Sequence, residues 1–130
     1  MTDVILFTAP HAVAILREAK ARQLAPLDEG RLFSLLAEAG FTHEQIASWY
    51  GCQITFIRWR IELLDLIADG QDALRRERLP VGLAWYIARL SEESQHHMLD
   101  RWLAGDFFDA LSAQSCARYI FRAERRADRG

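Results

Sequence analysis

The chain has 130 residues, of which 51% are hydrophobic, and a formal net charge of −2. This length and composition predict one domain with its own apolar core. No apolar run approaches the roughly 20 residues of a membrane-spanning helix, and the N-terminus lacks a basic secretory start, so a cytoplasmic protein without a membrane partner is expected. Cys52 and Cys116 lie far apart with no metal-ligand spacing, which excludes a disulfide framework and a zinc site.

Fifteen of the sixteen basic residues are arginine, and they gather at Arg58 and Arg60, at 75–78 and at 118–129. Arginine offers a planar set of donors that suits phosphate and guanine, although genome composition explains the same bias equally well. The negative net charge is not typical of a DNA-binding domain, so the distribution of charge is more informative than its sum.

The first half of the chain contains clear helix signals. A short β-leaning run at Val4–Thr8 precedes a helix expected over Pro10–Gln23, in which proline is a favourable first residue. A second helix is expected from Pro26 to just before Gly40.

The strongest local pattern runs from Thr42 to Leu64. The segment Thr-His-Glu-Gln has the form of a capping box, and Gly51 is suited to the left-handed conformation that ends a helix. Apolar residues then recur every three or four positions and predict a helix from Gln53. Two helices joined by a tight glycine turn are typical of a helix-turn-helix, although two packed helices without a DNA role have the same spacing.

The rest of the chain is also predicted to be helical, over Gly70–Arg78, Pro80–Leu90, Glu92–Ala104 and Ala113–Ala127, with Ser112 as the cap of the last helix and a frayed end from Arg125 to Gly130. The expected core includes Trp49, Trp85, Trp102, the stripe Met98, Leu99 and Leu103, and the pair Phe107 and Phe108. Exposure of both phenylalanines would instead favour a protein partner.

In a helix-turn-helix, the second helix presents its N-terminal side chains to the major groove. Glutamine can pair with adenine and arginine with guanine, while isoleucine or the threonine methyl can contact the thymine methyl. N–H groups at the start of the first helix can hold a phosphate. The predicted DNA-binding residues are therefore Thr42, His43, Gln53, Ile54, Thr55, Arg58, Trp59 and Arg60, with Trp59 at the surface. Among them, Gln53, Thr55 and Arg58 are expected to read bases, and Thr42, His43 and Arg60 to contact the DNA backbone.

No catalytic or metal-binding constellation stands out. His96 and His97 are adjacent on a predicted helix and project about 100 degrees apart, so one helix cannot aim both at one metal. Carboxylate pairs such as Asp106 and Asp109 fall at helix starts, where capping explains them. No glycine-rich phosphate loop or nucleophile elbow is present, so we expect neither an enzyme nor a cofactor.

The segment Leu24-Ala-Pro-Leu-Asp-Glu-Gly30, followed by Ala39-Gly-Phe-Thr-His-Glu-Gln-Ile-Ala47, resembles the central region of ParB/KorB-type partition proteins. Arg60-Ile-Glu-Leu-Leu-Asp-Leu66 is similar to the segment at the end of the family's recognition helix. Leu79-Pro-Val-Gly-Leu-Ala84 is similar to a later segment of the family. The resemblance covers about Leu24 to Ile120. It implies an all-α, multi-helix ParB/KorB-like helix-turn-helix domain that binds double-stranded DNA. A short N-terminal extension precedes this domain.

Two parts of full-length family members are not expected here. The arginine-rich phosphate segment of the nucleotide-binding domain is absent, and Arg17-Glu-Ala-Lys-Ala-Arg22 does not preserve the Glu-Asn-x-x-Arg-type sequence, so CTP binding is not carried over. The C-terminal dimerisation domain is also expected to be missing. A homodimer would then form through the last helix, where Ala117, Ile120 and Phe121 face one way.

These observations divide the chain into an N-terminal extension (1–24), a helix-turn-helix core (25–112) and a C-terminal basic helix with a frayed tail (113–130). The resemblance implies a nucleoid- or plasmid-associated bacterial protein that binds specific DNA in partition or transcriptional regulation of a plasmid or mobile element. The alternative is a protein-protein interaction module that binds a regulatory or partition protein. Cys52-Gln53-Ile54 favours this alternative, because the family usually has basic or hydroxyl residues there.

Overall fold

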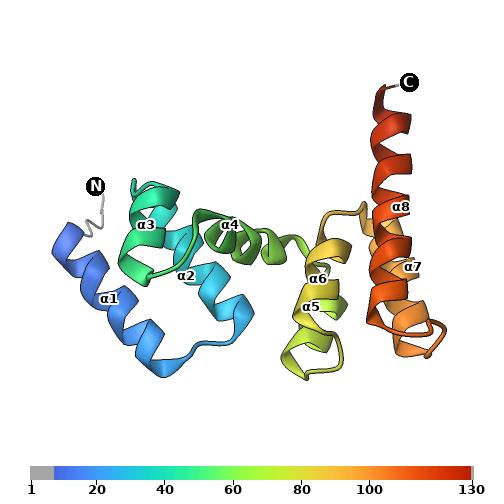
Figure 1. Ribbon diagram of the computed structural model, residues 1–130, viewed down its shortest axis with the longest axis horizontal. Helices are drawn as coiled ribbons and strands as arrows, with labels where there is room; N and C mark the ends of the chain where they lie inside the picture. The colour runs from blue at the N-terminus through green and yellow to red at the C-terminus, as the bar shows by residue number, and fades with distance from the viewer. Residues whose placement is uncertain (1–7, 130) are drawn as a thin grey trace. The chain divides into compact units, whose positions relative to one another are not determined.

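Figure 1 shows the computed structural model of the chain, which describes residues 8–129. The described residues form eight α-helices and no strand, so the prediction of an all-α fold is confirmed. The β-leaning run at Val4–Thr8 lies outside the described residues apart from Thr8, which caps the first helix. The chain divides into two compact units between Ile61 and Glu62, and each is described by itself. The three-part division expected from the sequence stays a prediction.

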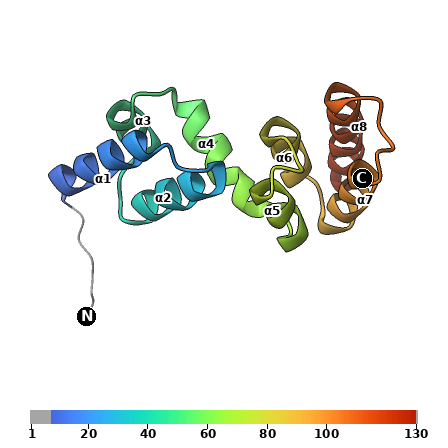
Figure 2. The same cartoon turned by 90° about the horizontal axis from the view of Figure 1, so that it is seen from below.

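The first unit contains α1 (Ala9–Arg22), α2 (Pro26–Glu38), α3 (His43–Tyr50) and α4 (Ile54–Glu62). Helix α3 packs against both α1 and α2 (Figure 2). Their shared core draws on all four helices, since each contributes apolar side chains at helical spacing. The fully buried members are Ala12, Leu16, Phe33, Leu36, Ile46 and Ile57.

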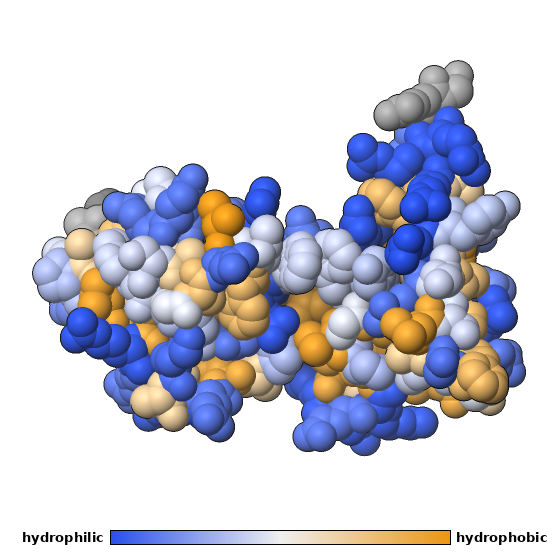
Figure 3. All heavy atoms as spheres, viewed as in Figure 1, coloured by the Kyte–Doolittle hydropathy of each residue, from blue (hydrophilic) through white to orange (hydrophobic). Residues whose placement is uncertain are grey.

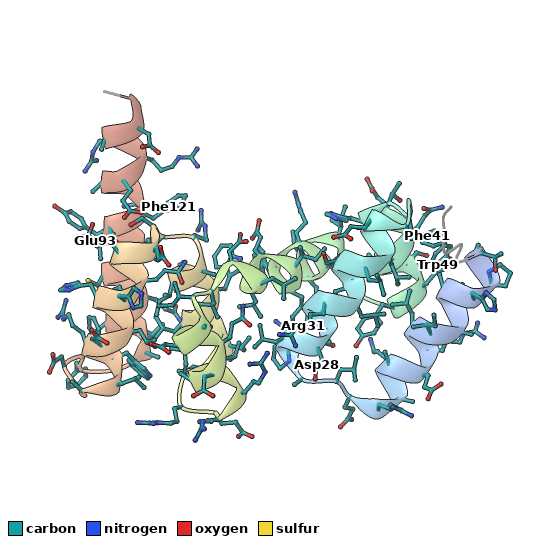
Figure 4. All side chains as sticks on the ribbon, turned by 180° about the vertical axis from the view of Figure 1, so that it is seen from behind. Asp28, Arg31, Phe41, Trp49, Glu93 and Phe121 are labelled. Carbon is teal, nitrogen blue, oxygen red and sulfur yellow. The ribbon has the colours of Figure 1, made fainter. Side chains whose placement is uncertain are left out.

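An aromatic pair extends this core at the start of the helix-turn-helix. Phe41 precedes α3 and Trp49 lies near its end, and their ring centroids are 5.5 Å apart in an edge-to-face arrangement (Figure 4). Both rings are half-buried against the core cluster. The contact closes the α2–α3 connection over the core, because edge-to-face aromatic pairs are favourable beyond the area that they bury.

The second unit contains a short 3₁₀ turn (Leu63–Asp65), α5 (Ala68–Arg75), α6 (Val81–Ala88), α7 (Glu92–Leu103) and α8 (Ala110–Arg129). Helix α6 contacts the 3₁₀ turn and the three other helices of this unit. Leu83, Ala84 and Ile87 of α6 are accordingly buried. The central position explains why α6 is the most apolar helix of the unit, since it has almost no face left for solvent.

The last helix differs from its prediction at both ends. It begins at Ala110, three residues early, because Asp109 Oδ1 accepts a hydrogen bond from the Ser112 N–H at 2.8 Å and acts as the cap assigned to Ser112. It continues to Arg129, through residues expected to fray. Its apolar face packs within the unit, where Ala117 is fully buried, so this face is not the dimer surface that the sequence indicated.

The aromatic predictions are confirmed only in part. Trp59 is 47% exposed, as predicted. Met98 and Leu99 are buried, but the prediction for Leu103 is wrong, because this last residue of α7 is 40% exposed. The other three tryptophans are half-buried. The prediction that Phe108 belongs to the core is wrong, because its side chain is 94% exposed, while Phe107 is half-buried beneath Arg101 at 4.3 Å.

Glu124 joins α8 to the start of α7. Its carboxylate accepts hydrogen bonds from the N–H and hydroxyl of Ser91, at 3.0 and 2.6 Å, and from the hydroxyl of Ser94 at 2.6 Å. Burial opposes ionisation of Glu124, but these hydrogen bonds outweigh it and lower the pKa of the carboxyl. The resulting stabilisation is complete at neutral pH and is lost as the pH falls through the lowered pKa, below the ordinary value of about 4.3.

We expect Glu124→Gln to lower the free energy of unfolding by about 1 kcal/mol at pH 7, because the hydrogen bonds lose their ionic acceptor. The difference from the native chain should be smaller at pH 3 than at pH 7, because the native carboxyl loses its charge as the pH falls through the lowered pKa. Urea unfolding followed by circular dichroism at both pH values measures it, with Asp128→Asn, an exposed site on the same helix, as the control. An equal deficit at both pH values would contradict this origin.

Candidate nucleic-acid interface

The first helix of the helix-turn-helix, α3, begins with a complete capping box. Thr42 Oγ1 accepts from the Gln45 N–H at 3.1 Å, and Gln45 Oε1 accepts from the Thr42 N–H at 2.9 Å. Two N–H groups that the helix leaves unpaired are therefore satisfied within the chain. The predicted phosphate contact at Thr42 and His43 would have to use other donors of this first turn.

The turn between the two helices needs a glycine. Gly51 has a φ of 80°, in the left-handed region, and its N–H and that of Cys52 both donate to the carbonyl of Ala47, at 2.9 and 3.0 Å. Any other residue at Gly51 would be strained, because a Cβ disfavours this conformation. Ala47 itself is 5% exposed and belongs to the core cluster of the first unit.

Helix α4 is anchored by one face and exposed on another. Ile57 is fully buried, and Ile54 and Phe56 pack partly against the core cluster. The opposite face carries Arg58 and Trp59 in its middle, both exposed. Since α4 is the second helix of the motif, its exposed face is the surface available to a DNA groove.

A buried polar cluster joins α4 to α2 and α3. Glu29, only 8% exposed, accepts from Arg60 Nε at 2.8 Å through Oε1 and from the Tyr50 hydroxyl at 2.5 Å through Oε2. The Arg60 guanidinium also lies 4.3 Å from the ring centroid of Phe56. Burial and the Glu29 hydrogen bond raise the pKa of Tyr50, so its hydroxyl stays a donor. We refer to Glu29, Tyr50 and Arg60 as the anchoring cluster.

Lys20 of α1 also contacts Tyr50, the last residue of α3. Its Nζ donates to the Tyr50 carbonyl at 2.9 Å and lies 4.7 Å from the Tyr50 ring centroid, so it caps the end of α3. An open hollow of about 420 Å³ lies between Lys20 and Arg60 and includes the Cys52 thiol. Burial raises the pKa of Cys52, which keeps the thiol protonated.

The structure places the predicted site residues in three different settings. Arg60 is half-buried and engaged by Glu29, so its role at the DNA backbone stays a prediction while its structural role is explicit. Sequence reasoning missed Glu29, which shares one helical face with Phe33 and Leu36, and that spacing could have marked it as buried. Of the other sites, Thr42, Gln53, Arg58 and Trp59 are exposed, and His43, Ile54 and Thr55 are half-buried.

A family model described as the ParB HTH domain matches residues 22–107, about two thirds of the chain. The chain belongs to the ParB helix-turn-helix domain family. The match runs from the end of α1 to just past α7 and contains the complete capping box, the Gly51 turn and α4. The resemblance inferred from the sequence is thereby confirmed, and with it a DNA-binding domain of the partition type. No curated protein matches the chain.

Two further findings concern metal sites and membrane-spanning helices in this ParB-type domain. Among the described residues, no three histidine, cysteine or acidic side chains come together in a way that could hold a metal ion. None of the described helices is long and apolar enough to cross a bilayer.

Proposed function

We propose that this chain recognises a specific DNA sequence through α4, in the partition or transcriptional regulation of a plasmid or other mobile element. The role is binding rather than catalysis. The observation that carries the proposal is the combination of the ParB family match with an α4 that is fixed to its unit by Ile57 and the anchoring cluster. A recognition helix held in one orientation can read bases without a large ordering cost on binding.

Specificity is assigned to the first two turns of α4. Gln53 immediately precedes α4 and is exposed. Thr55, in the first turn of α4, is half-buried, and Arg58, one turn later, is exposed. These residue types match the hydrogen-bonding edges of adenine and guanine and the methyl group of thymine in the major groove. Arg60 contributes to DNA recognition indirectly, because its hydrogen bond to Glu29 holds this part of α4 against the core.

The proposal is tested by fluorescence anisotropy of the purified chain with random-sequence DNA and with genomic fragments, over a series of salt concentrations. We expect Arg58→Ala to weaken specific binding about tenfold or more, because a bidentate arginine–guanine contact contributes about 1 to 3 kcal/mol of discrimination. Arg17→Ala removes the same charge from an exposed site on α1 and serves as the control. Binding that is absent at low salt, or equally sensitive to both substitutions, would refute the proposal.

A second candidate is a protein-binding module, and one observation favours it. Trp59 is 47% exposed next to Arg58, and the charge of Arg60 is compensated by Glu29, so this part of α4 has less positive charge than its sequence indicates. Tryptophan and arginine are frequent anchors of protein interfaces. Absence of DNA binding in the experiment above, together with Trp59 fluorescence that responds to a partition protein, would support this candidate.

A further inference from the structure

The outward face of α8 carries large apolar side chains. Leu111 and Tyr119 are 70% and 67% exposed, and Phe108, just before the helix, is 94% exposed. Leu111, Ser115 and Tyr119 follow one another at four-residue intervals, so they form one line along the helix. The opposite face is already covered within the unit, where Ala113 and Ala117 are fully buried. Two exposed side chains of this size in one line, with a third just before the helix, are typical of an interaction surface.

Charge is segregated along the same face. Asp106 and Asp109 are exposed at its beginning, whereas Arg118, Arg122 and Arg126 are exposed in its second half. Figure 3 shows mainly hydrophilic side chains over the C-terminal half of α8 and hydrophobic ones gathered near the opposite end of that unit. The face therefore has an acidic, apolar beginning and a basic end, and the two ends are complementary to each other.

We propose that this face binds a second copy of the chain, with the two α8 helices antiparallel and crossing at Ser115. A twofold axis at Ser115 places each residue opposite the one that is equally distant on the other side. Leu111 then packs on the partner's Tyr119, and Phe108 meets the partner's Arg122. Every contact occurs twice, as a closed symmetric dimer requires.

The small Ser115 side chain favours this crossing point. A serine at the contact allows the helix axes to approach within the usual packing distance of about 8 to 10 Å. The acidic beginning of each α8 then lies beside the basic half of the other, so that Phe108 of one copy meets Arg122 of the other. Arginine–ring contacts already occur in this unit, since Arg101 lies over Phe107 at 4.3 Å. Parallel helices would instead oppose Arg122 to Arg122.

Two charge variants test the arrangement. Asp106→Lys with Asp109→Asn makes the beginning of the face basic while it keeps a side-chain acceptor at the cap. Arg122→Glu with Arg126→Glu makes the end acidic. Each variant should repel its own copies, whereas a mixture of the two should pair, because each end then meets the opposite charge.

Sedimentation velocity without DNA, at concentrations up to about 0.5 mM, measures the association constants. We expect a native dimer, about tenfold or greater weakening in each variant alone, and recovery as a heterodimer in the mixture. Recovery also shows that the variants are folded. A monomeric native chain, or variants that do not pair when mixed, would overturn the proposal. Because no DNA is present, this result is independent of the proposed function. If the native chain is monomeric and the arginine variant binds DNA with a flatter salt dependence, the face contacts phosphates instead.

Discussion

Replacing Glu29 by alanine should destabilise the first unit by about 3 kcal/mol. The substitution leaves the Arg60 guanidinium, whose side chain is 19% exposed, without its carboxylate, and it removes the acceptor of the Tyr50 hydroxyl. Removing one partner of a largely buried ion pair is costly because the remaining charge has left water without compensation. Urea unfolding followed by circular dichroism measures the loss in the free energy of unfolding.

The neighbouring Asp28 provides the matched control. It also pairs with an arginine, Arg31, but at 3.6 Å and with both side chains more than half exposed (Figure 4). Surface pairs of this kind contribute about 0 to 1 kcal/mol, so Asp28→Ala should have little effect. A loss in Glu29→Ala no larger than that in Asp28→Ala would mean that the anchoring cluster does not stabilise the unit.

A double-mutant cycle separates the ion pair from its surroundings. If Glu29 and Arg60 act mainly on each other, Glu29→Ala combined with Arg60→Ala should cost clearly less than the sum of the two single substitutions. The same cycle repeated for DNA affinity asks whether Arg60 acts through the position of α4. If Arg60 acts through the position of α4, Glu29→Ala should weaken DNA binding even though the proposed base readers are unchanged.

The helix-turn-helix could be predicted from the sequence because its signals are local. The capping box at Thr42 and the left-handed Gly51 act within a few residues, and the isoleucine spacing of α4 reports which face is buried. The same kind of signal predicted α1, α2 and α7 to within one or two residues of their observed ends. Local chemistry is thus sufficient for the secondary structure of the candidate site.

The partners of individual polar side chains could not be predicted in this way. Arg60 and Glu29 are 31 positions apart, and their contact depends on how α2 and α4 pack. Sequence alone therefore assigned Arg60 to the DNA backbone. The exposure of Phe108 is a similar case, because an apolar residue indicates a preference for burial but not whether its own chain or another copy covers it.

Gln95 is the corresponding case in the second unit. This α7 side chain is 3% exposed and had no signal in the sequence. Its Oε1 accepts from the Ile67 N–H at 2.8 Å, and its Nε2 donates to the carbonyls of Asp65, Ala88 and Leu90 at 3.1 to 3.3 Å. One side chain therefore satisfies backbone groups both before α5 and at the end of α6.

Gln95→Leu, which keeps nearly the same volume, should cost about 3 kcal/mol, because it leaves these backbone groups unpaired in an apolar surrounding. Hydrogen exchange gives a site-specific readout, since the Ile67 amide should exchange much faster while amides of α2 and α3 in the first unit keep their protection. His96→Leu, at the exposed neighbouring position, controls for the effect of leucine on α7. If the Ile67 amide kept its native exchange rate in Gln95→Leu, this hydrogen bond would not be what orders the entry to α5.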